Sequence, residues 1–260
     1  MNKNHNLYFY FCFCFIISLE MNTELLKDYV EFPNPELAQD GLLCMGGDLS
    51  VPILISAYRQ GIFPWFNEDE PILWWSPNPR CVIKPGDLTI SKSMKQLIRK
   101  GLYTLKIDTA FETVIKKCQS IPRKGENGTW ITEDIINAYT KLFDLGIAHS
   151  FEVYEKEKLV GGLYGVSIGK MFFGESMFSE KSNTSKLAFI FLSEFLKEKD
   201  FSLIDCQVPN PHLLSMGCKE MERKNFLDIN KTGTQFDTIF GSWTQIGDDF
   251  LSMNNNLTKL

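Results

Sequence analysis

The chain has little histidine and no paired cysteine motif. Its 260 residues include three histidines, one of them close to the N-terminus, and seven cysteines without a C-x-x-C pair. These counts argue against a histidine-based metal site and against a zinc ribbon. The odd number of cysteines argues against a disulfide framework and fits a reducing compartment. We therefore expect no metal and no structural disulfide.

The sequence also lacks the loops that bind common cofactors. It has no G-x-G-x-x-G and no H-E-x-x-H. The segment Gly165–Lys170 resembles a P-loop, but three residues separate its glycines where four belong, and Met171 stands where Ser or Thr belongs. The segment Gly174–Phe178 begins like the nucleophile turn of a hydrolase but lacks the second glycine. We expect a β-turn in the first case, and no cofactor for the protein.

Charge is distributed unevenly along a chain of ordinary globular composition. The net charge is −5, but between Arg80 and Lys124 eleven basic residues stand against three acidic ones, a local charge of +8 that leaves −13 elsewhere. Within this segment Lys92, Lys95 and Arg99 follow at i, i+3 and i+7, on one face of a predicted helix. Like charges on one face repel each other unless an anion is present. The segment from Arg80 to Lys124 is a candidate phosphate-binding surface; for the helix face within it, the alternative is a solvated face.

The first twenty residues differ from the rest. The apolar run Leu7–Leu19 has 13 residues, too few to span a bilayer but enough for the core of a signal peptide. Three interpretations compete: a signal peptide, a membrane anchor, and a translation start at Met21 preceded by a gene-prediction artefact. We expect the third, because only Ser18 supplies a small residue before a cleavage site. Residues 1–20 are then a dispensable leader, and the protein is cytoplasmic without membrane contact.

The remaining chain predicts an α/β fold in two domains. Apolar spacing and caps predict helices from residue 50 to 61, over 92–100 and from 132 to 146. Beyond these the pattern predicts a mixed sheet and its helices: strands over 151–155, 159–167 and 171–178, a buried helix over 184–197, a strand over 201–208, a short helix to 216 and a strand over 218–227. We expect a small N-terminal α/β domain, residues 21–147, that carries the basic surface, and a mixed-sheet domain, residues 148–260.

Three polar side chains lie on predicted strands. Glu175 interrupts an apolar strand; burial without a partner would be costly, and alternation equally allows a solvent-facing position. Asp205 and Gln207, at i and i+2, share one face of a strand that Pro209 ends. Ligand crevices open at the carboxyl ends of strands in α/β folds, although an amphipathic edge strand would show the same pattern.

Tryptophans occur on both sides of the basic segment. Trp65 lies in Phe63-Pro-Trp-Phe66, and Trp130 lies in Gly128-Thr-Trp-Ile131. A tryptophan usually belongs to a core or to a rigid loop. Beside a basic surface, however, an exposed tryptophan can stack on a nucleobase.

Seven strings stand out along the chain: Gly46-Gly-Asp-Leu-Ser50, Gly61-Ile-Phe-Pro-Trp-Phe66, Ile72-Leu-Trp-Trp-Ser-Pro-Asn-Pro-Arg80, Gly128-Thr-Trp-Ile-Thr132, Gly161-Gly-Leu-Tyr-Gly165, Gly174-Glu-Ser-Met-Phe-Ser179 and Leu203-Ile-Asp-Cys-Gln207. Together they closely resemble the leucyl/phenylalanyl-tRNA–protein transferase family, and the match runs in order from about residue 32 to 226. The resemblance implies transfer of Leu or Phe, with Met as a third candidate donor, from aminoacyl-tRNA to the N-terminal Arg or Lys of a protein, which marks that protein for degradation. It also implies that residues 148–260 form a catalytic domain like the acyl-CoA N-acyltransferase (GNAT-like) fold.

The resemblance also implies roles for the polar residues. Gln207, oriented by Asp205, would contact the reacting amine, and Glu175 would help to place the cationic acceptor. The reaction of an ester with an amine is thermodynamically favourable. Aligning and deprotonating the amine therefore needs positioned polar groups and no cofactor.

Binding residues follow from the same resemblance. Trp65 and Trp130 match positions that line the site of the terminal adenosine. The apolar donor side chain would enter a pocket that involves Leu163 and the helix over 187–196, with Phe191 among its lining residues.

The basic helix would hold the acceptor stem of the tRNA. Its side chains Lys92, Lys95 and Arg99 would contact phosphates, independently of the base sequence.

Two other classes of protein remain possible. A CoA-dependent N-acyltransferase would share the fold, but its reaction would not account for the basic segment. A tRNA-binding module would not need Asp205, Gln207 and Glu175 together.

Overall fold

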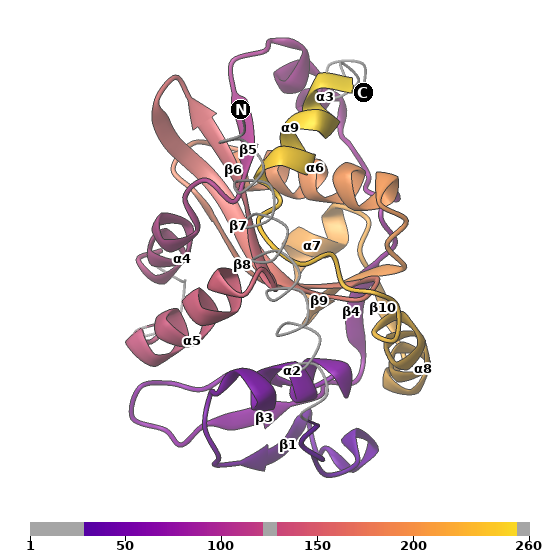
Figure 1. Cartoon of the computed structure of the whole chain (residues 1–260). Helices are drawn as coiled ribbons and strands as arrows, with labels where there is room; N and C mark the ends of the chain where they lie inside the picture. The colour runs from indigo at the N-terminus through magenta and orange to yellow at the C-terminus, as the bar shows by residue number, and fades with distance from the viewer. Residues whose placement is uncertain (1–28, 122–128, 254–260) are drawn as a thin grey trace, which may run out of the picture.

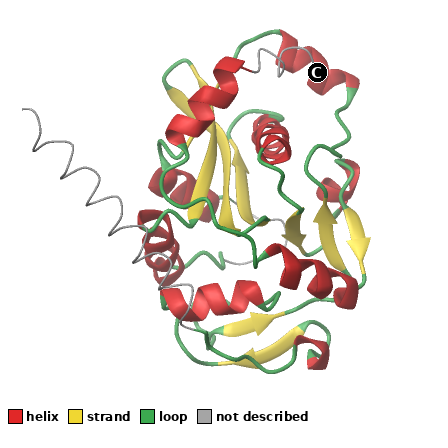
Figure 2. Cartoon of the chain, turned by 45° about the vertical axis from the view of Figure 1, so that its right-hand side comes forward, coloured by secondary structure: helices red, strands yellow, loops and turns green. Residues whose placement is uncertain are grey.

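The computed structural model describes residues 29–121 and 129–253 (Figures 1 and 2). The expected leader, residues 1–20, lies outside these ranges, as do Arg123 and Lys124 of the basic segment. Within them, no helix combines the length and the apolarity that crossing a bilayer requires.

The N-terminal part of the described chain forms a small antiparallel sheet beside one helix, at the bottom of Figure 1. In chain order its elements are η1 (Pro35–Leu37), β1 (Leu42–Met45), α2 (Val51–Arg59), β2 (Phe63–Pro64) and β3 (Leu73–Trp75). Helix α2 begins after Ser50, with a proline in its first turn, and the turn that follows it contains Gly61, as the sequence predicts. Gly61 has a φ of 74°, and a Cβ atom there would lie 2.5 Å from Leu227 Cδ2. Glycine is therefore required by both the backbone and its neighbour.

A seven-stranded sheet forms the centre of the molecule, in the order β10-β4-β9-β8-β7-β6-β5. Its strands are β4 (Arg80–Ile83), β5 (Thr104–Ile107), β6 (Ala148–Glu155), β7 (Lys158–Ile168), β8 (Met171–Ser179), β9 (Leu203–Gln207) and β10 (Lys219–Met221). Neighbouring strands are antiparallel except β8 and β9, which are parallel. Because β4 and β5 precede residue 148, this sheet draws on both sides of the expected domain boundary, and the division at that boundary stays a prediction.

Helices cover both faces of this sheet. They are α3 (Lys92–Arg99), α4 (Phe111–Gln119), α5 (Glu133–Asp144), α6 (Thr184–Glu198), α7 (Pro211–Ser215), α8 (Arg223–Gly233) and α9 (Thr244–Met253). Along β8, Met171 and Phe173 pack with the core that includes α4 and α5, and Phe172 packs with the core that includes α3, α6 and α9. Figure 1 shows α4 and α5 on one side of the sheet and α6 on the other. The expected α/β class, with a mixed sheet, is confirmed.

Most predicted elements are present, and one is wrong. The predicted helix over 184–197 is observed as Thr184–Glu198, and the β7–β8 turn contains Gly169 with a φ of 59°, as expected for a turn and not for a P-loop. The predicted strand over 218–227, however, is only three residues long, and α8 begins at Arg223. Buried residues follow at 223, 226, 230 and 233, which is a helical period that the strand assignment overlooked.

A buried ion pair connects β4, β9 and the neighbouring elements. Arg80 donates from Nε to Asp205 Oδ1 at 2.8 Å and from Nη2 to Oδ2 at 2.6 Å, and both side chains are at most 1% exposed. Arg80 Nη1 also donates to the carbonyl oxygen of Gly61 at 3.1 Å. The guanidinium lies 4.8 Å from the ring centre of Phe63 and 4.4 Å from that of Phe226. Arg80 is therefore a structural residue, and its inclusion in a phosphate-binding surface is wrong.

We expect the substitution Arg80→Met to lower the free energy of unfolding by about 3–5 kcal/mol, because it leaves the buried charge of Asp205 without its cationic partner. Urea unfolding followed by tryptophan fluorescence measures this change. The matched control is Lys116→Met, which removes a surface pair with Glu112 whose side chains are 52% and 66% exposed, and no measurable change is expected there. Equal effects of the two substitutions would show that the buried pair does not stabilise the fold.

Candidate active site

A cavity of about 410 Å³ opens where the two parallel strands separate. Strands β8 and β9 pair from Met171/Leu203 to Phe173/Asp205, and their pairing ends there although β8 continues to Ser179. The residues after this point line the cavity: Gly174 to Met177 from β8, and Cys206 to Asn210 at the end of β9 and beyond it. The opening lies at the carboxyl end of a strand in a mixed sheet, where the sequence predicts a site.

Two β-bulges shape the walls of this cavity. In β8, Glu175 is an extra residue between Gly174, opposite Gly165, and Ser176, opposite Tyr164. In β9, Cys206 is an extra residue between Asp205 and Gln207. Bulges redirect side chains that regular alternation would place elsewhere. Alternation alone could therefore not tell which way Glu175 points.

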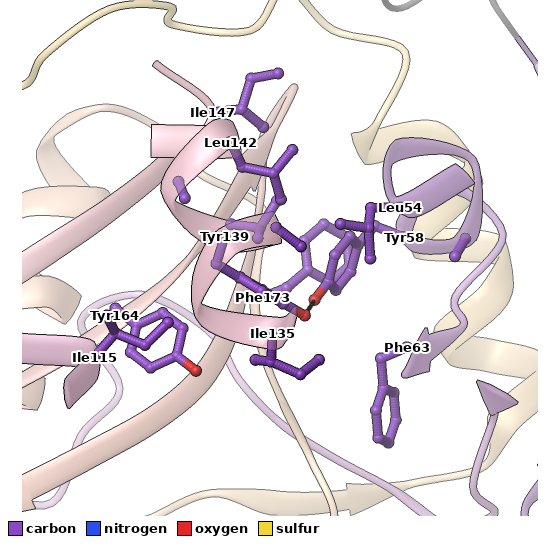
Figure 3. Close-up of a cluster of buried hydrophobic side chains, with 14 of the residues drawn as sticks. Leu54, Tyr58, Phe63, Ile115, Ile135, Tyr139, Leu142, Ile147, Tyr164 and Phe173 are labelled. Atoms are coloured by element: carbon purple, nitrogen blue, oxygen red, sulfur yellow. Dashed lines mark hydrogen bonds between the residues drawn. The ribbon is translucent and has the colours of Figure 1, made fainter. Parts of the chain in front are cut away.

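Glu175 accepts three hydrogen bonds at the cavity. Oε1 accepts from Tyr58 Oη at 2.7 Å and from Gln207 Nε2 at 2.8 Å, and Oε2 accepts from Tyr139 Oη at 3.1 Å. The two tyrosine oxygens also lie within hydrogen-bond distance of each other (Figure 3). Because each hydroxyl carries one proton, an ionised Glu175 and the two tyrosines make only two of the three hydrogen bonds among them at a time. Tyr58 comes from α2 and Tyr139 from α5, so elements distant in sequence meet at one carboxylate.

The environment of Glu175 favours its protonated form more than water does. The pKa of Glu175 is raised to about 7: burial is the largest cause and the negative charge of Asp205 adds to it, while the hydrogen bonds from Tyr58, Tyr139 and Gln207 act in the opposite direction. Burial also raises the pKa values of Tyr58 and Tyr139 well above the usual value, so both hydroxyls stay protonated and can donate. Neither tyrosine was an expected site residue: Tyr139 fits the apolar face of its helix, and no motif marks Tyr58.

Asp205 and Gln207 occupy different positions relative to the cavity. Gln207 lines it, with a φ of 63°, a left-handed conformation that is uncommon for this residue type. Asp205 is fully buried beside Arg80 and is absent from the lining. Its Oδ1 also accepts from the backbone N–H of Gln207 at 2.9 Å. Asp205 can therefore orient Gln207 through the backbone without touching a ligand.

Both expected tryptophans line the cavity. Trp65 is 38% exposed and its ring centre lies 5.5 Å from that of Trp75, whose Nε1 donates to the carbonyl oxygen of Trp65 at 2.6 Å. Trp130 is 8% exposed and comes just before α5. An indole that is fixed and partly exposed can present a flat face to an aromatic ligand.

Several other lining residues of the cavity are apolar. Leu163 lines the cavity as expected, together with Met177, Phe189, Leu192, Ile204 and Leu213. Phe191 does not, and that expectation is wrong: its ring packs against Phe151 at 5.3 Å and Phe250 at 6.0 Å between ring centres. Each residue turns a helix by about 100°, so α6 directs Phe191 away while its neighbours Phe189 and Leu192 line the cavity.

The basic face of α3 is present as predicted. Ser91 Oγ caps the helix by accepting from the backbone N–H of Met94 at 3.2 Å. Lys92 and Arg99 are exposed and Lys95 is half-buried. Within residues 29–121 and 129–253, none of these three cations forms an ion pair. In the same ranges no group of three or more His, Cys, Asp or Glu residues could hold a metal ion.

The sequence matches known proteins over most of its length. The model of the family "Leucyl/phenylalanyl-tRNA protein transferase" covers residues 82–231, and that of its "N-terminal domain" covers residues 47–78. A leucyl/phenylalanyl-tRNA–protein transferase of Hahella chejuensis is 52% identical over 207 residues, which are 78% of this chain and 88% of the relative. Another, of Flavobacterium johnsoniae, is 50% identical over 208 residues, 80% of this chain and 98% of the relative.

Among solved structures, that of L-PGS from Bacillus licheniformis is 15% identical, with a TM-score of 0.35 over 58% of this chain and 48% of that one, too little to assign a fold. The family models and the two relatives agree with the resemblance carried by the seven sequence strings. The chain therefore belongs to the leucyl/phenylalanyl-tRNA–protein transferase family.

Proposed function

We propose that this chain transfers Leu or Phe, with Met as a third candidate donor, from aminoacyl-tRNA to the N-terminal Arg or Lys of an acceptor protein. As a family member the chain is an aminoacyltransferase. The observation that carries the proposal is the cavity at β8 and β9, whose lining combines apolar side chains with the carboxylate of Glu175 and the amide of Gln207. This lining suits both an apolar donor side chain and a cationic acceptor.

The reaction needs the acceptor amine and the donor ester to meet in the cavity. The amine nitrogen attacks the ester carbonyl, the C–N bond forms, the C–O bond to the ribose breaks, and a proton passes from the amine to the ribose oxygen. Gln207 Nε2 donates to Glu175, so Gln207 offers its Oε1 to an amine N–H. Ionised Glu175 offers its charge to the cationic acceptor. Holding the reactants in this geometry is the main catalytic contribution available here.

The donor would contact two groups of residues that line the cavity. Leu163, Phe189 and Leu192 would surround the apolar side chain of the donor. Trp65 and Trp130 would hold its terminal adenosine by stacking. Phe191 is replaced in this role by Phe189 and Leu192, since it faces the core.

The RNA body would contact the basic face of α3. Lys92, Lys95 and Arg99 carry three positive charges without ion-pair partners among the described residues. Contacts with phosphates would be independent of base sequence, which suits an enzyme that accepts more than one tRNA. We place the reaction in the cytoplasm, where aminoacyl-tRNA is made, and its product would enter regulated proteolysis.

A donor competition tests the proposed function. The protein is incubated with a peptide that begins with Arg and with labelled phenylalanyl-tRNA or acetyl-CoA, and products are identified by mass spectrometry. We expect a peptide with one added N-terminal Phe and no acetylated peptide. Acetylation would indicate a CoA-dependent enzyme, and tRNA binding without transfer would indicate a binding module; either result overturns the proposal.

Removal of the Gln207 side chain should lower kcat by about 100-fold or more, with binding of phenylalanyl-tRNA nearly unchanged, because the amide acts on the amine in the transition state. Gln207→Gly suits this test, since glycine tolerates the φ of 63°. The control Gln245→Ala alters an exposed glutamine of α9 and should have no effect. Wild-type turnover in Gln207→Gly would remove Gln207 from the mechanism.

The KM for the Arg peptide should fall as the pH rises through about 7, because Glu175 is protonated below its raised pKa and carries a charge above it. In Glu175→Gln the KM for the Arg peptide should be high, and the fall of KM around pH 7 that comes from Glu175 should be absent. Titration of the peptide amine is common to both proteins, so the difference between their profiles isolates Glu175. Identical profiles would contradict the placement of the acceptor by Glu175.

Replacement of Lys92, Lys95 and Arg99 by Gln should weaken tRNA binding and reduce its salt dependence by about 0.7–0.9 log units of slope per lost phosphate contact. Transfer from phenylalanyl-adenosine, which lacks those phosphates, should be preserved. The control Lys116→Gln removes a cation that is already paired with Glu112. An equal loss with both donors would mean that α3 is only structural.

A further inference from the structure

Two basic side chains outside the residues discussed so far lie on helices that contribute to the cavity. His212, in α7, lines the cavity beside Asn210 and Leu213. Lys186 lies in the first turn of α6, three residues before Phe189, which also lines the cavity. Both basic side chains are half-buried. The helical spacing places Lys186 near the face of α6 that borders the cavity.

The two side chains are close enough to influence each other. Burial lowers the pKa of His212, and the positive charge of Lys186 lowers it further. Within the described residues, neither side chain takes part in an ion pair or a hydrogen bond. Lys186 thus contributes a positive charge that no carboxylate pairs within the described residues, and His212 contributes a ring N–H; a phosphate oxygen can accept from both.

The position of the pair connects the basic helix with the cavity. Met94 and Ile98 of α3 pack in the same hydrophobic cluster as Phe189 of α6 and Leu213 of α7. Figure 1 shows α6 and α7 between α3 and β9. Helices α3, α6 and α7 therefore pack against one core, which brings the basic helix into the same region of the molecule as α6 and α7.

We propose that Lys186 and His212 bind the phosphodiester that joins the terminal adenosine of the donor RNA to the preceding nucleotide. This inference rests on the proposed function. The reacting ester and that phosphodiester are attached to the same ribose, so an acyl group inside the cavity leaves the phosphodiester at its rim. Lys186 supplies a point charge and His212 an N–H donor, both suited to phosphate oxygens.

Two minimal donors test the proposal: phenylalanyl-adenosine, which has no phosphodiester, and phenylalanyl-cytidylyl-adenosine, which has one. Lys186→Gln should raise the KM for the second donor about tenfold, as expected for loss of one charged hydrogen bond, and leave the KM for the first unchanged. His212→Asn should act in the same direction. Lys186→Arg should restore most of the affinity for the second donor, because the charge is kept.

The control Lys197→Gln removes the same charge from α6 at a lysine that is 61% exposed and lies near Glu194, with 3.8 Å between Nζ and Oε2. It should change neither KM. If Lys186→Gln affects both donors equally, or neither, the phosphodiester site does not exist although transfer stands. If the unaltered protein uses neither donor, nor full phenylalanyl-tRNA, the proposed function fails and this inference fails with it.

Discussion

The pair of Arg80 and Asp205 is the interaction on which the rest of the structure depends. Two charges that are almost completely buried are costly unless every polar atom is satisfied. Here the carboxylate takes two bonds from the guanidinium and one from the backbone of Gln207, and the guanidinium also binds the carbonyl of Gly61. One ion pair thus joins β4 to β9, holds the turn after α2 and fixes the backbone of a proposed catalytic residue. Stability and function share the same atoms.

The second constraint is the separation of β8 and β9. Parallel pairing stops after Phe173 and Asp205, and a bulge in each strand redirects Glu175 and Gln207. The left-handed backbone of Gln207 is a local strain of the kind that functional sites retain when the surrounding structure enforces it. The apolar residues Leu163, Phe189 and Leu192 of the cavity belong to the core with α6, whereas Tyr58 and Tyr139 belong to the core with α5.

Periodicity predicted most of the fold, because long apolar patterns survive tertiary context. Helix α6 and the strands β6 to β8 agree with prediction to within a few residues. Short elements with mixed composition were harder to predict. The start of α8 was predicted as a strand, although buried Arg223, Phe226 and Asn230 follow at helical spacing.

The site was predictable in its residue types and less so in its geometry. Glu175, Gln207, Trp65, Trp130 and Leu163 meet at one cavity, as the resemblance implied, although their roles stay proposals. Arg80 counts as a surface cation in any sum of charges, and only three-dimensional contacts reveal its burial. Phe191 was misplaced because a helix that is buried nearly all round gives no sequence signal for which face meets a ligand. Tyr58 and Tyr139 look like ordinary core residues until Glu175 is placed between them.

We propose above that one cavity, where β8 and β9 stop pairing, holds both donor and acceptor. A crystal structure with phenylalanine joined by a stable amide to 3′-amino-3′-deoxyadenosine, together with an Arg-initiated peptide, tests it most directly. The account predicts the phenyl ring beside Leu163, Phe189 and Leu192, the adenine against Trp65 or Trp130, and the arginine of the peptide near Glu175. An analogue bound elsewhere, or an acceptor beside Leu163, Phe189 and Leu192, would contradict it.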